Sequence, residues 1–124
     1  MSTAVQVLAV FVGVMLVAVW VMEAFLYRHP RVHPMLLIEP RDFEAVKLWN
    51  VNVGFYNLTT AVAMFLGVVL VNTDHVAHGE ALILFTAGQH VFLAAVLLVV
   101  KPKLWLNAIL ESAPNLVILV LALA

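Results

Sequence analysis

The chain has 124 residues, of which 65% are hydrophobic and 10% are charged, and its formal net charge is −1. With a mean hydropathy of +1.11, it lacks the polar side chains that would cover a water-facing surface, which excludes a soluble globular domain. The six Lys and Arg residues lie in two short segments, 28–47 and 101–103, and long uncharged apolar runs surround them. This pattern is typical of an integral membrane protein.

Four stretches are long and apolar enough to cross a bilayer, which requires about 20 residues each. We predict spans at residues 4–27, 48–71, 81–100 and 104–124. Each must be helical, because lipid offers no partner to a free backbone N–H or C=O group. Short connections favour antiparallel neighbours. The predicted fold is therefore all-α, a single transmembrane domain (1–124) that forms an integral membrane antiparallel four-helix bundle.

The distribution of basic residues predicts the orientation of these spans. The segment after the first span holds four basic residues, the segment after the third holds two, and residues 72–80 hold none. Since basic residues favour the cytoplasmic side, we expect a multi-pass protein of the cell inner (plasma) membrane with both termini outside. Residues 28–47 then form a cytoplasmic interfacial segment. Its start is too rich in Pro to continue a helix, and its end forms a helical turn leading into the second span.

Polar side chains inside the predicted spans are expensive to place in lipid and mostly face inward. Nearly all of them fall in the cytoplasmic half, which predicts one polar chamber that opens to the cytoplasm or the inner leaflet. Helical spacing places residues 107, 111 and 115 on one stripe and residues 52, 56 and 60 on another. Gly54 and Gly88 are expected to allow close helix approach. The expected ligand-binding residues are Glu23, Asn52, Asn57, Gln89, Asn107 and Asn115.

Glu111 carries the strongest chemical signal. An ionised carboxylate in hydrocarbon costs several kcal/mol, so this group must be neutral, paired or hydrated. The spans contain no Lys or Arg, which leaves His90 as the cationic candidate at that depth. A carboxyl group beside a His is suited to acid–base chemistry. Glu111, His90 and Tyr56 are the predicted catalytic residues. Pro114 is expected to free the Leu110 carbonyl and bend the last span.

Each of these residues also has a structural interpretation. Asn, Gln, Thr and Tyr side chains in membrane bundles often serve as hydrogen-bonding contacts between helices. Glu23 lies near the interface, where it could reach water or Arg28, and His90 could be a satisfied core residue. A metal site is not expected, because the Glu-x-x-His signature of carboxylate-bridged bundles is missing. No cofactor is predicted.

The second span contains the sequence Asn52-Val53-Gly54-Phe55-Tyr56-Asn57. It resembles the N-x-G-x-Y-N signature of the domain of unknown function 1304 family, small four-span bacterial integral membrane proteins. Met22-Glu23-Ala24-Phe25-Leu26-Tyr27 is similar to the end of that family's first helix. The resemblance implies that Glu23 and the residues of the signature are shared by the family.

The chain departs from the family's pattern in the last span. Glu111 stands where the family's pattern has Gln, and Asn115 stands where a small residue is expected. The Gln89-His90 pair is also not part of the family's pattern. The resemblance therefore implies a shared polar pocket, to which this chain adds acid–base groups.

These features leave three functional interpretations. The first is a membrane protein whose intramembrane polar pocket binds or converts a small apolar or lipid-like molecule, as an isomerase, hydrolase or lyase would. The second is a proton-coupled small-molecule carrier, for which four helices would require a homodimer. The third is a structural or accessory subunit. The expected partners are membrane lipid, a small apolar ligand and a second copy of the chain, with no nucleic acid.

Overall fold

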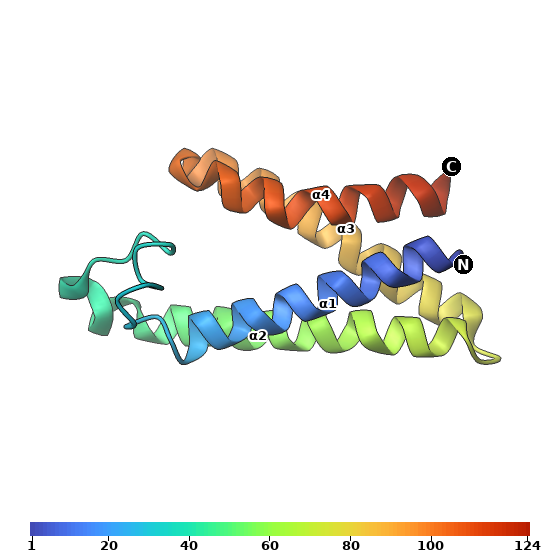
Figure 1. The fold of residues 1–124 in the computed structure, drawn as a ribbon, viewed down its shortest axis with the longest axis horizontal. Helices are drawn as coiled ribbons and strands as arrows, with labels where there is room; N and C mark the ends of the chain where they lie inside the picture. The colour runs from blue at the N-terminus through green and yellow to red at the C-terminus, as the bar shows by residue number, and fades with distance from the viewer. The chain divides into compact units, whose positions relative to one another are not determined.

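The computed structural model describes residues 1–124 and contains helices but no strands. Its long helices are α1 (Thr3–Ala24), α2 (Phe43–Val71), α3 (Val76–Val100) and α4 (Trp105–Leu123) (Figure 1). Two short 3-10 helices, η1 (Pro40–Asp42) and η2 (Pro102–Leu104), precede α2 and α4. All four long helices have the length and composition to cross a membrane. The predicted all-α fold with four membrane-spanning helices is confirmed.

The helix bounds differ from the predicted spans where local hydrogen bonding decides the boundary. α1 ends at Ala24 because the backbone N–H groups of Phe25 and Leu26 both donate to the Val21 carbonyl, which closes the last turn. α2 begins at Phe43, so the turn expected at the end of the interfacial segment is the first turn of this helix. α3 begins at Val76, which leaves only residues 72–75 as the connection between α2 and α3.

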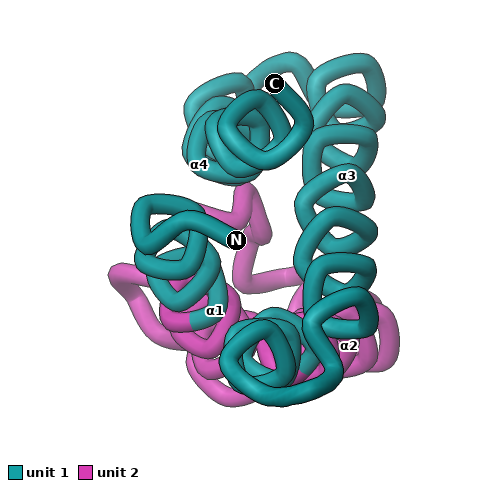
Figure 2. Tube along the Cα trace, turned by 90° about the vertical axis from the view of Figure 1, so that its right-hand side faces the viewer, with its two compact units in different colours: residues 1–13, 63–124 teal, residues 14–62 magenta.

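The chain divides into two compact units, each built from parts of several elements (Figure 2). Unit 1 comprises residues 1–13 and 63–124, and therefore the start of α1, the end of α2, and all of α3 and α4. Unit 2 comprises residues 14–62, and therefore the rest of α1, the interfacial segment, and the first part of α2.

Unit 1 is an antiparallel bundle of helical segments. The Asn72 side chain, just after α2, donates to Gln6 Oε1 near the start of α1 at 2.8 Å. Gly67 faces Ile83 across α2 and α3, and η2 reverses the chain between α3 and α4. Each helix buries small or aliphatic residues at helical spacing. The fully buried apolar side chains include Val5, Ala9, Met64, Ile83, Ala87 and Ile118.

Glycine permits a close crossing of α2 and α3. A Cβ atom on Gly79 would lie 2.6 Å from the Gly67 carbonyl oxygen and 2.6 Å from the Val71 nitrogen. Gly88, in the same helix α3, has no atom within 4 Å of the corresponding position. The expectation that Gly88 allows close packing is therefore wrong, because the surface around it is open. Gly79, which was not predicted, has that role.

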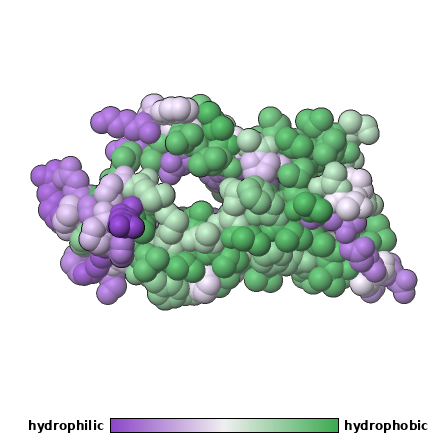
Figure 3. All heavy atoms as spheres, in the orientation of Figure 1, coloured by the Kyte–Doolittle hydropathy of each residue, from purple (hydrophilic) through white to green (hydrophobic).

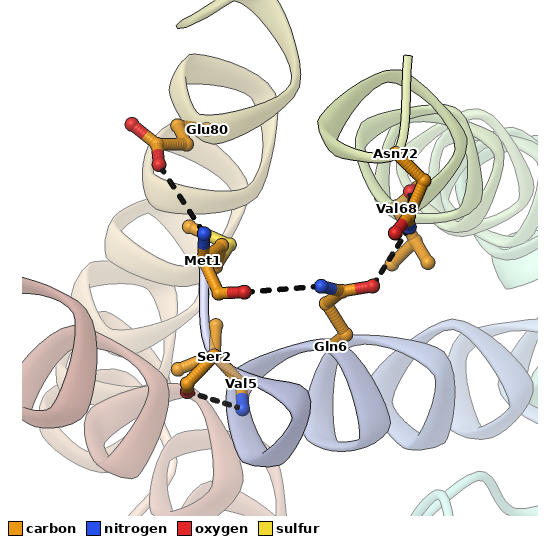
Figure 4. A network of polar contacts seen from close by, with 7 residues as sticks. All are labelled: Met1, Ser2, Val5, Gln6, Val68, Asn72 and Glu80. Carbon is orange, nitrogen blue, oxygen red and sulfur yellow. Dashed lines mark hydrogen bonds and ion pairs between the residues drawn. The ribbon is translucent and has the colours of Figure 1, made fainter. Parts of the chain in front are cut away.

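A polar network ties together the helix ends near the N-terminus (Figure 4). The N-terminal ammonium of Met1 lies 3.8 Å from Glu80 Oε1 on α3. Gln6 Nε2 donates to the Met1 carbonyl at 3.1 Å, and its oxygen accepts from Asn72, which also donates to the Val68 carbonyl. Through Gln6, the first turn of α1 is joined to the end of α2.

Aromatic rings of unit 2 contact one another. Trp20, Phe25 and Phe55 contact one another edge to face, with centroids 5.5–6.1 Å apart. In the interfacial segment, Phe43 contacts Tyr27 and His33 in the same manner. Residues 25–37 form a series of turns, and η1 follows at residues 40–42.

Basic side chains of unit 2 are held by partners of their own. Arg28 forms an ion pair with Glu44 and stacks over the rings of Tyr27 and Phe43. Glu23, which was expected to reach Arg28 or water, is bonded elsewhere, as described below. Arg41 forms an ion pair with Glu39 at 2.8 Å.

The surface of the helices is largely hydrophobic on the face that Figure 3 shows, and hydrophilic side chains gather near the helix ends. Large apolar side chains are among the most exposed, including Phe85 at 72% and Val99 at 81%. A soluble protein buries such groups. Their exposure along α3 agrees with a helix surface that contacts lipid.

Candidate functional site

Two clusters of the predicted polar residues occur, one in each unit. The cluster in unit 1 combines His90 of α3 with Glu111 and Asn115 of α4. The His90 side chain is 2% exposed, and its Nε2 atom lies 4.0 Å from Glu111 Oε1. His90 and Glu111 are 21 residues apart in the sequence. The antiparallel packing of α3 and α4 brings their side chains together.

The hydrogen bonding of His90 fixes which ring nitrogen faces the carboxyl group. Nδ1 lies 3.1 Å from the Thr86 carbonyl, one turn earlier in α3. A carbonyl oxygen only accepts, so Nδ1 carries the proton and donates. In the neutral ring Nε2 is then the basic nitrogen, and this is the atom directed at Glu111. The local backbone therefore sets the tautomer that acid–base exchange with a carboxyl group requires.

Asn115 lies one turn after Glu111 in α4 and is 1% exposed. Its Nδ2 atom donates to the Glu111 carbonyl at 2.7 Å. This bond sets the orientation of the amide, since only the nitrogen end can donate. Asn115 Oδ1 is consequently directed away from that carbonyl, and this buried oxygen has no hydrogen-bond partner. α4 continues through Pro114, and the bend expected there stays a prediction.

The cluster in unit 1 is suited to hold one exchangeable proton. The two arrangements, neutral His90 with a carboxylic acid and protonated His90 with a carboxylate, have the same net charge. No Lys or Arg lies in α3 or α4 to compete for the carboxyl group. At 4.0 Å the two groups are beyond direct hydrogen-bond distance. A group placed between them would therefore be in reach of both.

The cluster in unit 2 joins the end of α1 to α2. Asn57 Nδ2 donates to Glu23 Oε1 at 2.5 Å, and Asn50 Nδ2 donates to the Glu23 backbone carbonyl at 2.6 Å. The carbonyls at the end of a helix lack partners within the helix, so Asn50 supplies one. A Cβ on Gly54 would lie 3.0 Å from the Ala24 nitrogen, which shows how closely the helices approach. These contacts join the end of α1 to α2, and ligand binding by Glu23 and Asn57 stays a prediction.

Four predicted site residues lie at exposed positions and form no hydrogen bond with either cluster. Tyr56 is 69% exposed, and the Asn52 side chain donates to the Leu48 carbonyl of its own helix at 2.8 Å. Gln89 and Asn107 are also exposed. The sequence predicts a single polar chamber lined by all of these residues. Because they belong to both units, this chamber stays a prediction.

Some participants were not predicted as site residues. Thr86 orients the His90 ring through its backbone carbonyl, and the spacing of four residues was the available signal. Asn50, which donates to the Glu23 carbonyl, was not predicted either. A surface depression of about 340 Å³ near the start of α1 contains none of the predicted residues. It is lined by Thr3, Gln6, Val7, Val10 and Val68.

No group of three or more His, Asp or Glu side chains is placed to hold a metal ion. The rings of His75 and His78, which follow α2, contact each other with centroids 5.7 Å apart.

The four long apolar helices define this chain as an all-α, multi-pass membrane protein. The chain belongs to the family described as "Protein of unknown function (DUF1304)", whose match covers residues 10–123. The resemblance carried by residues 52–57 is thereby confirmed. Neither the curated proteins nor the solved structures contain a match to this chain.

Proposed function

We propose that the protein binds a small apolar or lipid-like molecule within the membrane and converts it by proton transfer at the His90–Glu111 pair. The observation that supports this most directly is the placement of a basic imidazole nitrogen 4.0 Å from a carboxyl oxygen, with the imidazole 2% exposed. Groups of this kind are poised for acid–base chemistry when one donates and the other accepts. Isomerisation and hydration are reactions of this type.

In this proposal, Glu111 and His90 are the catalytic residues and exchange a single proton with the bound molecule. His90 is held by its bond to Thr86 and needs no rotation to act. Asn115, one turn from the carboxyl group, is the ligand-binding residue of the same cluster. The helices that carry these groups are apolar enough to cross a membrane, which suits an apolar molecule that enters from the bilayer.

We further propose that the protein lies in the plasma membrane of a bacterial cell with both termini outside the cytoplasm. Support comes from the basic residues, which lie only in the segments between α1 and α2 and between α3 and α4. With this orientation, the His90–Glu111 pair is reached from the cytoplasmic leaflet.

Hydrogen exchange on co-purified molecules tests the proposed chemistry. The full chain is purified in lipid nanodiscs and incubated in D₂O, and bound small molecules are extracted and analysed by mass spectrometry. We expect a bound apolar molecule that gains deuterium at a carbon position. Glu111→Gln preserves the size of the side chain and should retain the molecule but abolish its deuterium uptake.

Glu44→Gln is the matched control, because this exposed glutamate pairs with Arg28 and not with the cluster. Deuterium uptake should be unchanged in this variant. Protein that carries no small molecule, or equal uptake in wild type and Glu111→Gln, would contradict the proposed function.

A further inference from the structure

The unpaired oxygen of Asn115 specifies the chemistry of the molecule that the cluster receives. A buried acceptor without a donor is costly, and most such atoms in folded proteins are satisfied. Here the amide cannot turn to satisfy its oxygen from within the chain, because Nδ2 is committed to the Glu111 carbonyl. The chain itself therefore supplies no donor to this atom.

The other two polar side chains of the unit 1 cluster present the same polarity. The only N–H of neutral His90 donates to Thr86, which leaves Nε2 as an acceptor. The Glu111 carboxyl group, 4.0 Å from Nε2, adds further acceptor oxygens to the cluster. No Lys or Arg lies in α3 or α4. The cluster is thus rich in acceptors and complements a ligand that donates.

We infer that the ligand is an apolar molecule with a hydrogen-bond donor at one end, a hydroxyl or an ammonium group, and that Asn115 Oδ1 accepts this bond. The inference rests on the proposed function, whose substrate class it narrows. Asn115 selects the ligand and positions its polar end beside Glu111 and His90. An ester, ether or hydrocarbon of equal size offers no hydrogen to this oxygen and is discriminated against.

Isomeric probes separate hydrogen bonding from size and hydrophobicity. 1-Heptanol and hexyl methyl ether have the same atoms, but only the alcohol donates. Binding to the full chain in nanodiscs is measured by titration of the side-chain amide signals of ¹⁵N-asparagine-labelled protein. The Asn115 signal is the one that disappears in Asn115→Leu. We expect the alcohol to bind at least tenfold more tightly than the ether and to shift this signal, and the ether to leave it in place.

A second pair of probes distinguishes the two donor groups. Heptylammonium donates and carries a charge, whereas heptyltrimethylammonium carries the charge alone. The ammonium should also bind at least tenfold more tightly than its methylated analogue. If heptylammonium binds more tightly than 1-heptanol, the natural ligand is a protonated amine, and the reverse order identifies an alcohol. Either order supports the inference.

Asn115→Leu should reduce the tenfold preference for 1-heptanol over hexyl methyl ether to less than twofold. Ser112→Ala should retain it, because this hydroxyl group of the same helix α4 donates to the Ile109 carbonyl and is not part of the cluster. Equal binding of the two isomers to wild-type protein, or no binding of any probe, would overturn the inference. These outcomes are separable from failure of the proposed function, which is read from deuterium uptake in Glu111→Gln and uses no probe.

Discussion

Glu23 in the last turn of α1 and Asn57 in α2 are joined by a hydrogen bond of 2.5 Å between the carboxyl oxygen and the amide nitrogen. The same glutamate accepts a second bond from Asn50 through its backbone carbonyl. One residue of α1 is therefore held twice by α2, at positions two turns apart. This relationship explains why an acidic residue is tolerated at the end of a membrane-spanning helix.

Removal of the Asn57 amide should weaken the protein. Asn57→Ala leaves the half-buried carboxyl group without its donor, and we expect a loss of about 1–2 kcal/mol of unfolding free energy. Thermal or denaturant unfolding in detergent micelles measures the change. Asn52→Ala is the control, since that side chain bonds only within its own helix and should change stability by less than about 0.5 kcal/mol. Equal losses in both variants would argue against the Glu23–Asn57 contact.

Two glycines of α3 should respond differently to the same substitution. Gly79→Ala introduces a Cβ that collides with the backbone of α2, and we expect a loss of about 1–3 kcal/mol. Gly88→Ala meets open space and gains helix propensity, so stability should be unchanged or rise by up to about 1 kcal/mol. Unfolding of the two variants under identical conditions checks both values. Tolerance of alanine at position 79 would mean that α2 and α3 cross less closely.

The interfacial segment contains a residue whose substitution should stabilise the protein. Leu37 has φ = 55°, in the left-handed region, which costs an ordinary L-residue about 1 kcal/mol or more. Asn tolerates this conformation better, so Leu37→Asn should raise the unfolding free energy by about 0.5–1 kcal/mol. Met35→Asn, nearby and also exposed, should bring no such gain. Equal effects would show that polarity, and not backbone conformation, matters here.

The proposed orientation can be tested directly, because the chain contains no cysteine. Asp74→Cys lies between α2 and α3 and should react with a membrane-impermeant maleimide on intact cells. Met35→Cys lies in the interfacial segment and should react only after the cells are lysed. Gel-shift or mass measurement of the labelled protein gives the result. The opposite pattern would reverse the orientation.

Hydropathy and charge were sufficient to predict the class of protein and the number of its spans. Each of these signals is local, since about 20 consecutive apolar residues commit a segment to the bilayer whatever the rest of the chain does. The helix boundaries were less predictable. α2 begins at Phe43 because a 3-10 turn starting at Pro40 leads directly into it, and hydropathy does not report such turns.

The candidate site shows where periodicity stops being informative. The spacing of Asn52, Tyr56 and Thr60 correctly places them on one stripe, but this stripe includes the exposed Tyr56. The flanking residues Asn50 and Asn57 are the ones that contact Glu23. Helical spacing states which side chains share a face, whereas the neighbouring helix determines which face is covered.

The sequence by itself therefore determined that this chain is a four-span membrane protein with acidic and imidazole groups at membrane depth. Only the tertiary structure decided that His90 lies opposite Glu111, that Asn57 binds Glu23, and that the Asn115 oxygen is left unpaired. Insertion of a segment into the membrane depends on the composition of that segment alone. The pairing of polar side chains depends on the rotation and register of neighbouring helices. Close contacts between helices, such as the one at Gly79, set that rotation and register.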